Sequence, residues 1–323
     1  VLVWAWLLAL ALLVALDAPH SQASATSTTR HVLDDGGFDA EDCGDSQSPC
    51  QTLRYALGLV SAGDTVRVAN RFAPATYFGP ITITQPITLA GGWNATFTSS
   101  GLLWQRPSPC EAFRTTIDAQ GTGRAISIAD YVDATIDCFT ITGGDATGLG
   151  GSGALGYDTG GGIHSYFGDT IVSNCIISGN VASRSFIGLG GGVGFVGGSV
   201  TLQGNVIQGN TAATSNSGYG GGAYFRHMAS AIVSGNKVLD NVACDVVGYG
   251  RGGGIATQFG SSALQDNNIY RNTAAHGGGV WASGAPGLWV YPSITDCLIH
   301  ENVATTGGGG IHVAYADHAV LTG

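Results

Sequence analysis

Apolar and small polar residues alternate over runs of four to six positions through most of the chain, as in Ser199-Val200-Thr201-Leu202. A period of two is typical of β-strands, whereas amphipathic helices need apolar residues every three to four positions. Clusters of Gly, Asn and Ser interrupt each run, so the strands are short and the turns are frequent. The pattern therefore predicts an all-β protein made of many short strands.

The strand pattern repeats about every 30 residues in the second half of the chain. A glycine triplet followed by a small apolar residue occurs six times, with that residue at Ile163, Val193, Ala223, Ile255, Val280 and Ile311. An aliphatic residue followed three positions later by asparagine marks the same repeats, at Asn180, Asn210, Asn241, Asn272 and Asn302. Such a period indicates one supersecondary unit stacked on copies of itself.

The composition indicates which kind of solenoid this is. With 53 glycines in 323 residues, helical repeats are excluded, because each glycine would cost a helix up to ~1 kcal/mol. Three short strands per repeat, joined at Gly, Asn and Ser corners, predict one coil of a parallel β-helix. When the repeats are aligned on the asparagine, aliphatic residues and alanines form further columns. We expect these columns to fill a flattened tube with one layer of side chains every ~4.8 Å.

The asparagine column is predicted to be structural. A corner Asn tolerates left-handed backbone angles, and its amide can bond the backbone of the next coil to form a ladder. We interpret the glycine triplets as tight corners. A glycine-rich phosphate loop is the alternative, but neither a Lys-Ser/Thr pair nor a helix follows the triplets.

The Gly-Gly-x-Ile and aliphatic-x-x-Asn marks resemble the repeats of the chlamydial polymorphic outer-membrane proteins and of secreted bacterial right-handed β-helix proteins. The resemblance covers the chain from about Ile141 to its end, although the family's Phe in Phe-x-x-Asn is Ile or Val here. It implies the pectin-lyase-like fold, a right-handed parallel β-helix solenoid with about one coil per 30 residues.

The chain is predicted to have three segments. Residues 1–25 combine an apolar run from Val1 to Leu16 with Ala23-Ser24-Ala25, the pattern of a secretory signal peptide that is truncated at its start. A membrane anchor is the alternative, but the run falls short of the ~20 residues needed to span a bilayer. We therefore expect a secreted or cell-surface protein with no transmembrane span in the mature chain.

Residues 26–110 are predicted to form an N-terminal cap with the first coils, and residues 111–323 the β-helix repeats, truncated at the C-terminus. Ser48 and Pro49 suit the start of a helix, and Gly63 suits its end. Between them, apolar residues follow helical spacing at Leu53, Ala56, Leu57 and Val60. We expect this helix to cover the open first coil, whose backbone would otherwise be exposed.

Seven cysteines in an exported protein suggest disulfides. Cys43 and Cys50 flank a short acidic loop and are the preferred pair, whereas a Cys110–Cys138 pair stays open. Cys175 and Cys297 share a column but lie four coils apart, roughly 19 Å at ~4.8 Å per coil, which exceeds the reach of a disulfide.

The net charge of −10, with Lys237 as the one lysine, argues against nucleic acid as a partner. Most acid density lies in one loop, at Asp34, Asp35, Asp39, Glu41, Asp42 and Asp45. Such a loop is either a Ca²⁺ site, since Ca²⁺ takes six to eight oxygen ligands, or simply solvated. No other metal site is expected.

The best candidates for catalysis are two aspartates on adjacent coils, Asp266 and Asp296. One coil spacing, ~4.8 Å, is close to the ~5–5.5 Å between the carboxylates of retaining glycosidases. Tyr270 and His300 share the outward face, with Lys237 one coil earlier. The alternative is that these are ordinary outward-facing residues, since only seven acids occupy residues 160–323.

Loop length varies at particular corners of the repeat, and those corners carry aromatic residues. The candidates for a binding surface are Phe186, Tyr219, Tyr249, Trp289 and Tyr291. Insertions in solenoids often map to one binding face, and exposed aromatic rings suit contact with sugars or proteins. The alternative is that these rings fold back as local plugs.

Two functions remain open. The first is a non-catalytic adhesive or structural surface element that binds a glycan or a cell-surface protein. The second is a polysaccharide lyase or glycoside hydrolase of the pectin-lyase-like fold. An assay for unsaturated or reducing-end products separates them, with Asp266→Asn and Asp296→Asn as controls.

Overall fold

The computed structural model describes residues 27–71, 75–151, 153, 156–244, 246, 249–285, 290–316 and 318–323. The predicted signal peptide lies outside these residues, as does Trp289. Among the described residues, no helix is long and apolar enough to cross a membrane.

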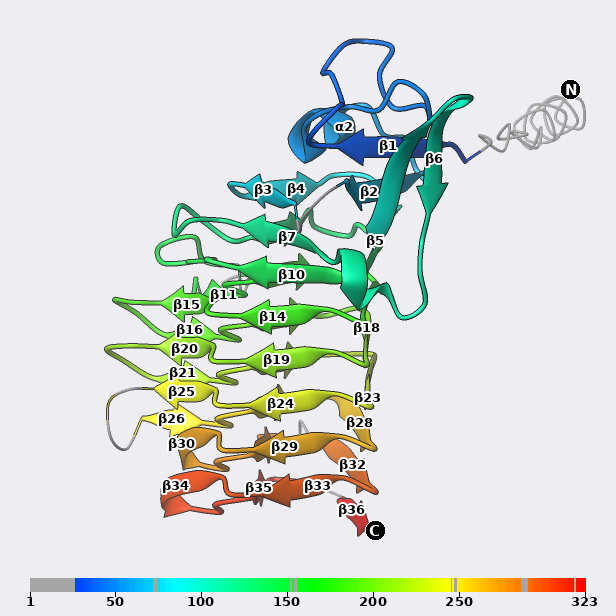
Figure 1. Cartoon of the computed structure of the whole chain (residues 1–323). Helices are drawn as coiled ribbons and strands as arrows, with labels where there is room; N and C mark the ends of the chain where they lie inside the picture. The colour runs from blue at the N-terminus through cyan, green and yellow to red at the C-terminus, as the bar shows by residue number, and fades with distance from the viewer. Residues whose placement is uncertain are drawn as a thin grey trace, which may run out of the picture.

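The described strands form a right-handed parallel β-helix with four sheets, which we name A to D (Figure 1). The fold class predicted from the repeat is thus confirmed. Sheet A contains β1 (Thr29–Leu33), β2 (Thr65–Asn70), β5 (Ile87–Thr98), β9 (Ala134–Asp137), β13 (Thr170–Ser173), β18 (Ser199–Gln203), β23 (Ser230–Ser234), β28 (Ser261–Gln265), β32 (Tyr291–Thr295) and β36 (Val320–Thr322). Sheet B contains β3 (Thr76–Phe78), β7 (Thr115–Asp118), β10 (Phe139–Thr142), β14 (Ile176–Ser178), β19 (Val206–Gln208), β24 (Lys237–Leu239), β29 (Asn268–Tyr270) and β33 (Leu298–His300).

Sheets C and D complete each coil. Sheet C contains β4 (Ile81–Ile83), β8 (Ile126–Ile128), β12 (Ile163–Tyr166), β17 (Val193–Val196), β22 (Ala223–Arg226), β27 (Ile255–Gln258), β31 (Val280–Ser283) and β35 (Ile311–Ala314). Sheet D contains β11 (Asp158–Thr159), β15 (Val181–Ser183), β16 (Gly188–Leu189), β20 (Thr211–Ala213), β21 (Gly218–Tyr219), β25 (Val242–Cys244), β26 (Gly250–Arg251), β30 (Thr273–His276) and β34 (Val303–Gly307). The chain passes from C to A, B and D before it enters the next coil.

Sheet D corrects the expectation of three strands per repeat. After the asparagine, the chain leaves the tube along one short strand and returns along a second, as in β15 and β16. We call the pairs β15/β16, β20/β21 and β25/β26, with the described residues between them, the arms; Figure 1 shows these strands on the same side of the solenoid. The following coils have the single strands β30 and β34 in their place. The loop-length variation seen in the sequence is therefore largely the presence or absence of an arm.

The core consists of the aliphatic columns that the repeat predicts. Ile177, Ile207, Val238 and Ile269 pair in register along sheet B and are fully buried. A second column, from Val172 to Leu264, does the same along sheet A. Because the coils are in register, each side chain packs on its counterpart one coil away, and the tube has a continuous apolar interior.

The asparagines form a buried ladder at the corner after sheet B. Asn210 donates its side-chain amide to the Ile177 carbonyl at 2.9 Å and to Oδ1 of Asn241 at 3.0 Å. Equivalent bonds join Asn180 to Asn210, Asn241 to Asn272, and Asn272 to Asn302. The ladder thus satisfies backbone groups that a buried corner would otherwise leave unpaired.

A second asparagine ladder, which we did not predict, lies at the corner between sheets A and B. Asn205 donates its amide to Oδ1 of Asn236, and Asn236 does the same to Asn267, at 3.0 and 2.9 Å. Cys175 and Cys297, whose shared column was noted in the sequence, occupy its two ends and contact Asn205 and Asn267. The two ladders fix the two bends that flank sheet B.

The N-terminal helix is α2 (Leu53–Gly58), and it lies over the first coil beside β1 (Figure 1). Its N-cap is Thr52, whose hydroxyl accepts a hydrogen bond from Tyr55 N at 3.2 Å, so the expectation of Ser48 as cap was wrong. The helix also ends before Gly63. The helix starts later than the sequence predicted because Cys50, just before it, is held in a β-bridge with Val32 and by a disulfide to Cys43.

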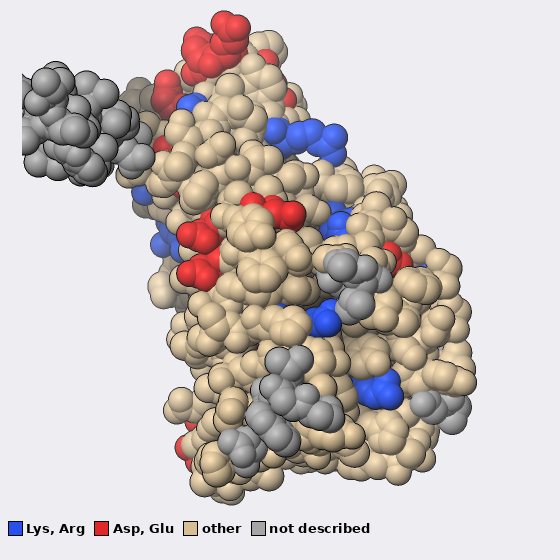
Figure 2. Space-filling model, turned by 180° about the vertical axis from the view of Figure 1, so that it is seen from behind, with Lys and Arg blue, Asp and Glu red and all other residues tan. Residues whose placement is uncertain are grey.

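Two carboxylates of the acidic loop, Asp39 and Asp45, bind backbone groups, and Figure 2 shows acidic side chains gathered at this end of the molecule. Asp39 accepts from Gln51 N and from the backbone and hydroxyl of Thr52, while Asp45 accepts from Gln47 N and Ser48 N. Within the described residues, the one grouping of three potential metal ligands is Asp39 with Cys43 and Cys50. Both cysteines are joined in the disulfide, so this grouping offers a cation one carboxylate.

Candidate functional site: a polar groove along one corner

Two adjoining cavities of about 670 and 330 Å³ form a groove outside the corner between sheets A and B. They share Asp137 and Asn174, and we call them together the corner groove. Its floor is lined by Asp137, Ser173, Asn174, Gln203, Gly204, Ser234, Gly235, Gln265 and Asp266, and its N-terminal end by residues 106–111. The groove runs along the solenoid axis across five coils.

Two adjacent columns of the repeat make the floor. The last residue of each sheet A strand, from Asp137 through Ser173 and Gln203 to Gln265, pairs in register with the next. The groove therefore presents one polar side chain per coil, spaced ~4.8 Å apart. Such a row of hydroxyl, amide and carboxylate groups suits an extended polar ligand.

The second column is fixed by its backbone. Asn174, Gly204, Gly235, Asp266 and Asp296 all have left-handed φ, between 52° and 64°. Gly, Asn and Asp enter this region most readily, and they hold these five positions, whereas Cys138 occupies the first position of the column at 64°. The two glycines carry no side chain, so they hollow the middle of the groove.

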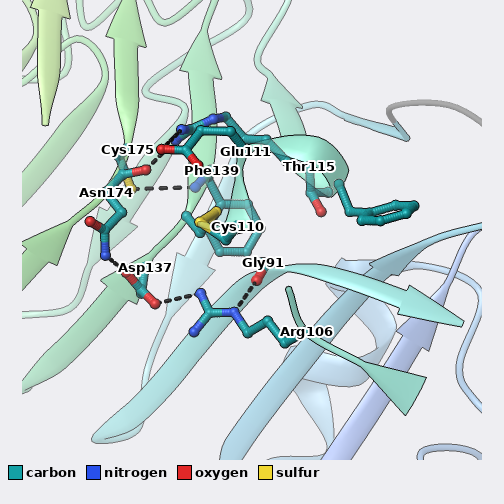
Figure 3. The surroundings of a disulfide bond; sticks show 12 residues. Gly91, Arg106, Cys110, Glu111, Thr115, Asp137, Phe139, Asn174 and Cys175 are labelled. Atoms are coloured by element: carbon teal, nitrogen blue, oxygen red, sulfur yellow. Dashed lines mark hydrogen bonds and ion pairs between the residues drawn. A yellow bond between two sulfur atoms is a disulfide. The ribbon is translucent and has the colours of Figure 1, made fainter. Parts of the chain in front are cut away.

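The N-terminal end of the groove is an ion pair between Arg106 and Asp137 (Figure 3). Arg106 follows β6 (Gly101–Gln105), which pairs antiparallel with β5, and it also donates to the Gly91 carbonyl at 3.0 Å. The other carboxylate oxygen of Asp137 accepts from Ser173 at 2.7 Å and Asn174 at 2.8 Å. The carboxylate is thus held by three side chains from two segments, Arg106 after β6 and Ser173 with Asn174 at the end of β13.

These contacts set the protonation state of Asp137. Burial alone would raise the pKa of Asp137, but hydrogen bonds from Ser173, Arg106 and Asn174, with the charge of Arg106, lower it below its ordinary value. An ionised carboxylate with this many donors is a poor general acid. Its position indicates that it orders the end of the groove.

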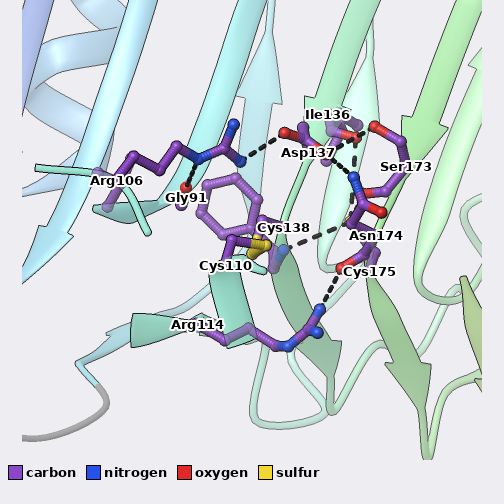
Figure 4. Close-up of polar contacts among 12 residues, drawn as sticks. Gly91, Arg106, Cys110, Arg114, Ile136, Asp137, Cys138, Ser173, Asn174 and Cys175 are labelled. Carbon is purple, nitrogen blue, oxygen red and sulfur yellow. Dashed lines mark hydrogen bonds and ion pairs between the residues drawn. A yellow bond between two sulfur atoms is a disulfide. The ribbon is translucent and has the colours of Figure 1, made fainter. Parts of the chain in front are cut away.

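A disulfide between Cys110 and Cys138 joins η1 (Cys110–Phe113) to the solenoid beside this ion pair (Figure 4). The sequence left this pairing open. Arg114 donates to the Asn174 carbonyl and pairs with Glu111 at 3.6 Å. Cys175 lies next to the disulfide, and burial raises the pKa of its thiol to about 12, so it stays protonated. The groove therefore has one covalently fixed end.

The two candidate catalytic aspartates lie in the left-handed column on adjacent coils. Both Asp266 and Asp296 are exposed, but only Asp266 lines the corner groove. Their left-handed φ gives a backbone reason for aspartate at these positions. Asp137 is four coils from Asp266, roughly 19 Å at ~4.8 Å per coil, which exceeds the ~9.5 Å limit for paired glycosidase carboxylates.

The other catalytic candidates lie on sheet B. Tyr270 and His300 are stacked, with ring centroids 5.1 Å apart. The ring nitrogens of His300 lie 3.2 Å from Asn268 Oδ1 and 3.5 Å from Glu301 Oε1. Lys237 is exposed and pairs in register with Asn268 rather than with Tyr270. The histidine and the lysine therefore belong to different outward columns.

The candidate aromatic surface is divided between two corners. Phe186 and Tyr249 lie on the arms and are 44% and 55% exposed. Tyr219 also lies on an arm, but it is half-buried, and its hydroxyl accepts a hydrogen bond from Arg251 at 2.7 Å. Tyr291 begins β32 in sheet A, at another corner of the tube. The structure thus groups three of these rings on one side and separates the fourth.

No protein-family model and no curated protein matches this chain. Among solved structures, it is similar to a pectin methylesterase mutant in complex with a hexasaccharide, with 12% identity, a TM-score of 0.46, and coverage of 89% of this chain and 81% of that one. It is also similar to pectin methylesterase PemA from Erwinia chrysanthemi, with 12% identity, a TM-score of 0.41, and coverage of 84% and 81%. At these values neither similarity carries an argument about function.

Proposed function

We propose that this chain is a secreted or cell-surface β-helix that binds an extended glycan along the corner groove without cleaving it. The observation that carries the proposal is the continuous row of polar side chains, one per coil, along the floor of the groove. Beside this row, Gly204 and Gly235 carry no side chain and leave the middle of the groove open. Sugar hydroxyls both donate and accept hydrogen bonds, which matches a row of Ser, Gln and Asn side chains. The aromatic residues of the arms are a further surface for adhesion.

The carboxylates support binding rather than cleavage. Asp137 is occupied by Arg106, Ser173 and Asn174, and it lies too far from Asp266 to form an acid–base pair with it. The second candidate, a glycan-cleaving enzyme, is favoured by two observations: Asp266 is exposed within the groove, and the exposed Asp296 lies on the next coil of the same column. We therefore design the test to separate the two.

The decisive variant fills the groove without straining the backbone. Gly235→Asn places a side chain at a left-handed position where nothing lies within 4 Å, and Asn174 occupies the same column. Gly209→Asn is the matched control, because Gly209 is also left-handed and open but lies at the next corner, outside the groove. On an array of neutral and acidic oligosaccharides, we expect Gly235→Asn to weaken binding at least ~10-fold, the equivalent of one lost hydrogen bond or clash.

Gly209→Asn should bind as the wild type does. Equal binding by Gly235→Asn and the wild type would refute the groove as the binding site. Release of unsaturated or new reducing ends from any glycan, abolished by Asp266→Asn or Asp296→Asn, would establish the enzymatic alternative.

A further inference from the structure

A further cavity, of about 350 Å³, lies away from the corner groove, where the arms end. It occupies the angle between sheets C and D, and its lining includes Tyr219, Arg251, His276, Trp281, His312 and Tyr315. A volume of this size is typical of small-molecule sites. None of its described lining residues is Asp or Glu, although the whole chain carries a net charge of −10.

The register of the two sheets creates this cavity. In sheet D, Tyr219, Arg251, His276 and Gly307 follow one another in a single column. In sheet C, Trp281 and His312 are neighbours in the column that faces it. The last arm ends at Arg251, so the next coils leave the space beside His276 and His312 open.

Arg251 is held in place as a cationic group. It donates to the Tyr219 hydroxyl at 2.7 Å, and its guanidinium lies 5.1 Å from the Tyr219 ring centroid and 5.9 Å from that of Trp281. Contact with aromatic faces fixes the guanidinium plane. A guanidinium held in this way binds a planar carboxylate through two parallel hydrogen bonds.

The two histidines add further donors. Their rings are 5.2 Å apart, and Nδ1 of His276 is buried with no hydrogen-bond partner among the described residues. A Cβ placed on Gly307 would lie 3.6 Å from Nδ1 of both His276 and His312, so both atoms border the same small space. Ten side-chain atoms of the described residues are buried without a partner, and His276 Nδ1 is the one that belongs to the lining of this cavity, where a ligand or water can satisfy it.

We propose that this cavity binds the carboxylate of an acidic sugar, with Arg251, His276 and His312 as the donors. The ring of Tyr315, which is 57% exposed, supplies an apolar face for a pyranose ring, and the buried Trp281 supports Arg251 from behind. This site is separate from the corner groove and does not depend on glycan binding there. We expect the cavity to bind a single acidic sugar residue, either at the end of a glycan chain or within it.

Affinity is expected to rise as the pH falls. The charged and titratable groups that line the cavity are Arg251, His276, His312, Tyr219 and Tyr315, and none of the described lining residues is a carboxylate. Desolvation, His312 and Arg251 lower the pKa of His276 from its ordinary value, so it is neutral at pH 7.5 without a ligand. An anion favours the protonated form, and binding therefore takes up protons.

The test is calorimetric titration of the whole protein with glucuronate, glucose, acetate and inorganic phosphate at pH 7.5 and pH 5.5. We expect glucuronate to bind more tightly than the other three probes, and more tightly at pH 5.5. Arg251→Gln should weaken glucuronate binding about 10- to 100-fold, the range for a lost charge-assisted hydrogen bond. Arg271→Gln, at another corner, is the matched control and should have no effect.

Two further variants separate binding from folding. Gly307→Ala fills the space between the histidines at ordinary contact distances, so it should weaken binding while the melting temperature is retained. His276→Gln should reduce the pH dependence. Equal affinity for acetate or phosphate, no difference between glucuronate and glucose, or wild-type binding by Arg251→Gln would each overturn the proposal.

Discussion

The buried ladder asparagines and the residues immediately before them occupy the same bends but are constrained in different ways. Asn241 is fully buried, and its amide joins three coils, whereas Asp240 beside it faces solvent with a φ of 54°. In the exposed column the residue type changes from Gly179 and Gly209 to Asp240, Arg271 and Glu301. Hydrogen-bond geometry thus fixes the residue type on the inside of a corner. On the outside, the backbone angle is restricted but the residue type varies.

Among substitutions at the corner itself, the largest expected effect is that of Asn241→Ala. The substitution removes the acceptor of the Asn210 backbone N–H, one of the two acceptors of the Asn210 side-chain amide, and the side-chain donor to the Ile207 carbonyl. At about 1–3 kcal/mol for each buried unsatisfied group, partly relieved by relaxation, we expect a loss of ~3–5 kcal/mol. Urea denaturation measures it. Asp240→Asn, which tolerates the same φ, should stay within ~0.5 kcal/mol of the wild type; a comparable loss there would contradict the comparison.

A second test of the contrast between buried and exposed positions compares a charge placed in the apolar core with the loss of an exposed charge. Ile207→Asp puts a carboxylate into a fully buried column, so the solenoid should fail to fold or lose most of its β-sheet circular dichroism. Arg271→Ala removes an exposed pair with Asp240 at 2.7 Å and should leave the melting temperature unchanged. Equal behaviour of the two variants would show that the columns are wrongly assigned.

Removal of a disulfide is expected to lower the free energy of unfolding by an intermediate amount. Cys110→Ser with Cys138→Ser releases a link of sequence separation 28, and loop-closure entropy suggests a loss of ~3–4 kcal/mol. The link from Cys43 to Cys50, of separation 7, should contribute about 2 kcal/mol. Denaturation of the two double variants compares them. A larger effect at the shorter link would mean that native-state contacts, and not chain entropy, dominate.

The smallest expected effect concerns Asp137, whose side chain faces the groove but is partly buried. Its folded pKa is lowered, so it contributes stability that is present above the unfolded pKa of about 3.9 and is lost as pH falls through the folded value. Asp137→Asn should therefore be less stable than the wild type at pH 7, and the difference should shrink towards pH 3. Melting curves across that range measure it, and a difference independent of pH would exclude the ionised carboxylate as the cause.

Much of the interior was determined by the sequence alone. The period of the glycine triplets and asparagines gives the coil, and the aliphatic columns around Ile207 give its register, because each layer must repeat the last to fill the tube. The second ladder was also visible in principle, since Asn205, Asn236 and Asn267 recur 31 residues apart. Its signal was obscured because cysteines occupy both ends of the column.

Other features were decided by the tertiary structure. The corner groove depends on Arg106 reaching Asp137 from outside the repeat, and the cavity between sheets C and D depends on Arg251 and His276 being neighbours where the arms stop. Neither pairing follows a regular spacing in the sequence. Contacts on the outside of the tube are made by insertions, whose length and path the repeat does not determine. The repeat determines the interior of the tube because the side chains of each coil pack on their counterparts in the next coil. The exterior is determined by the irregular segments that interrupt the repeat.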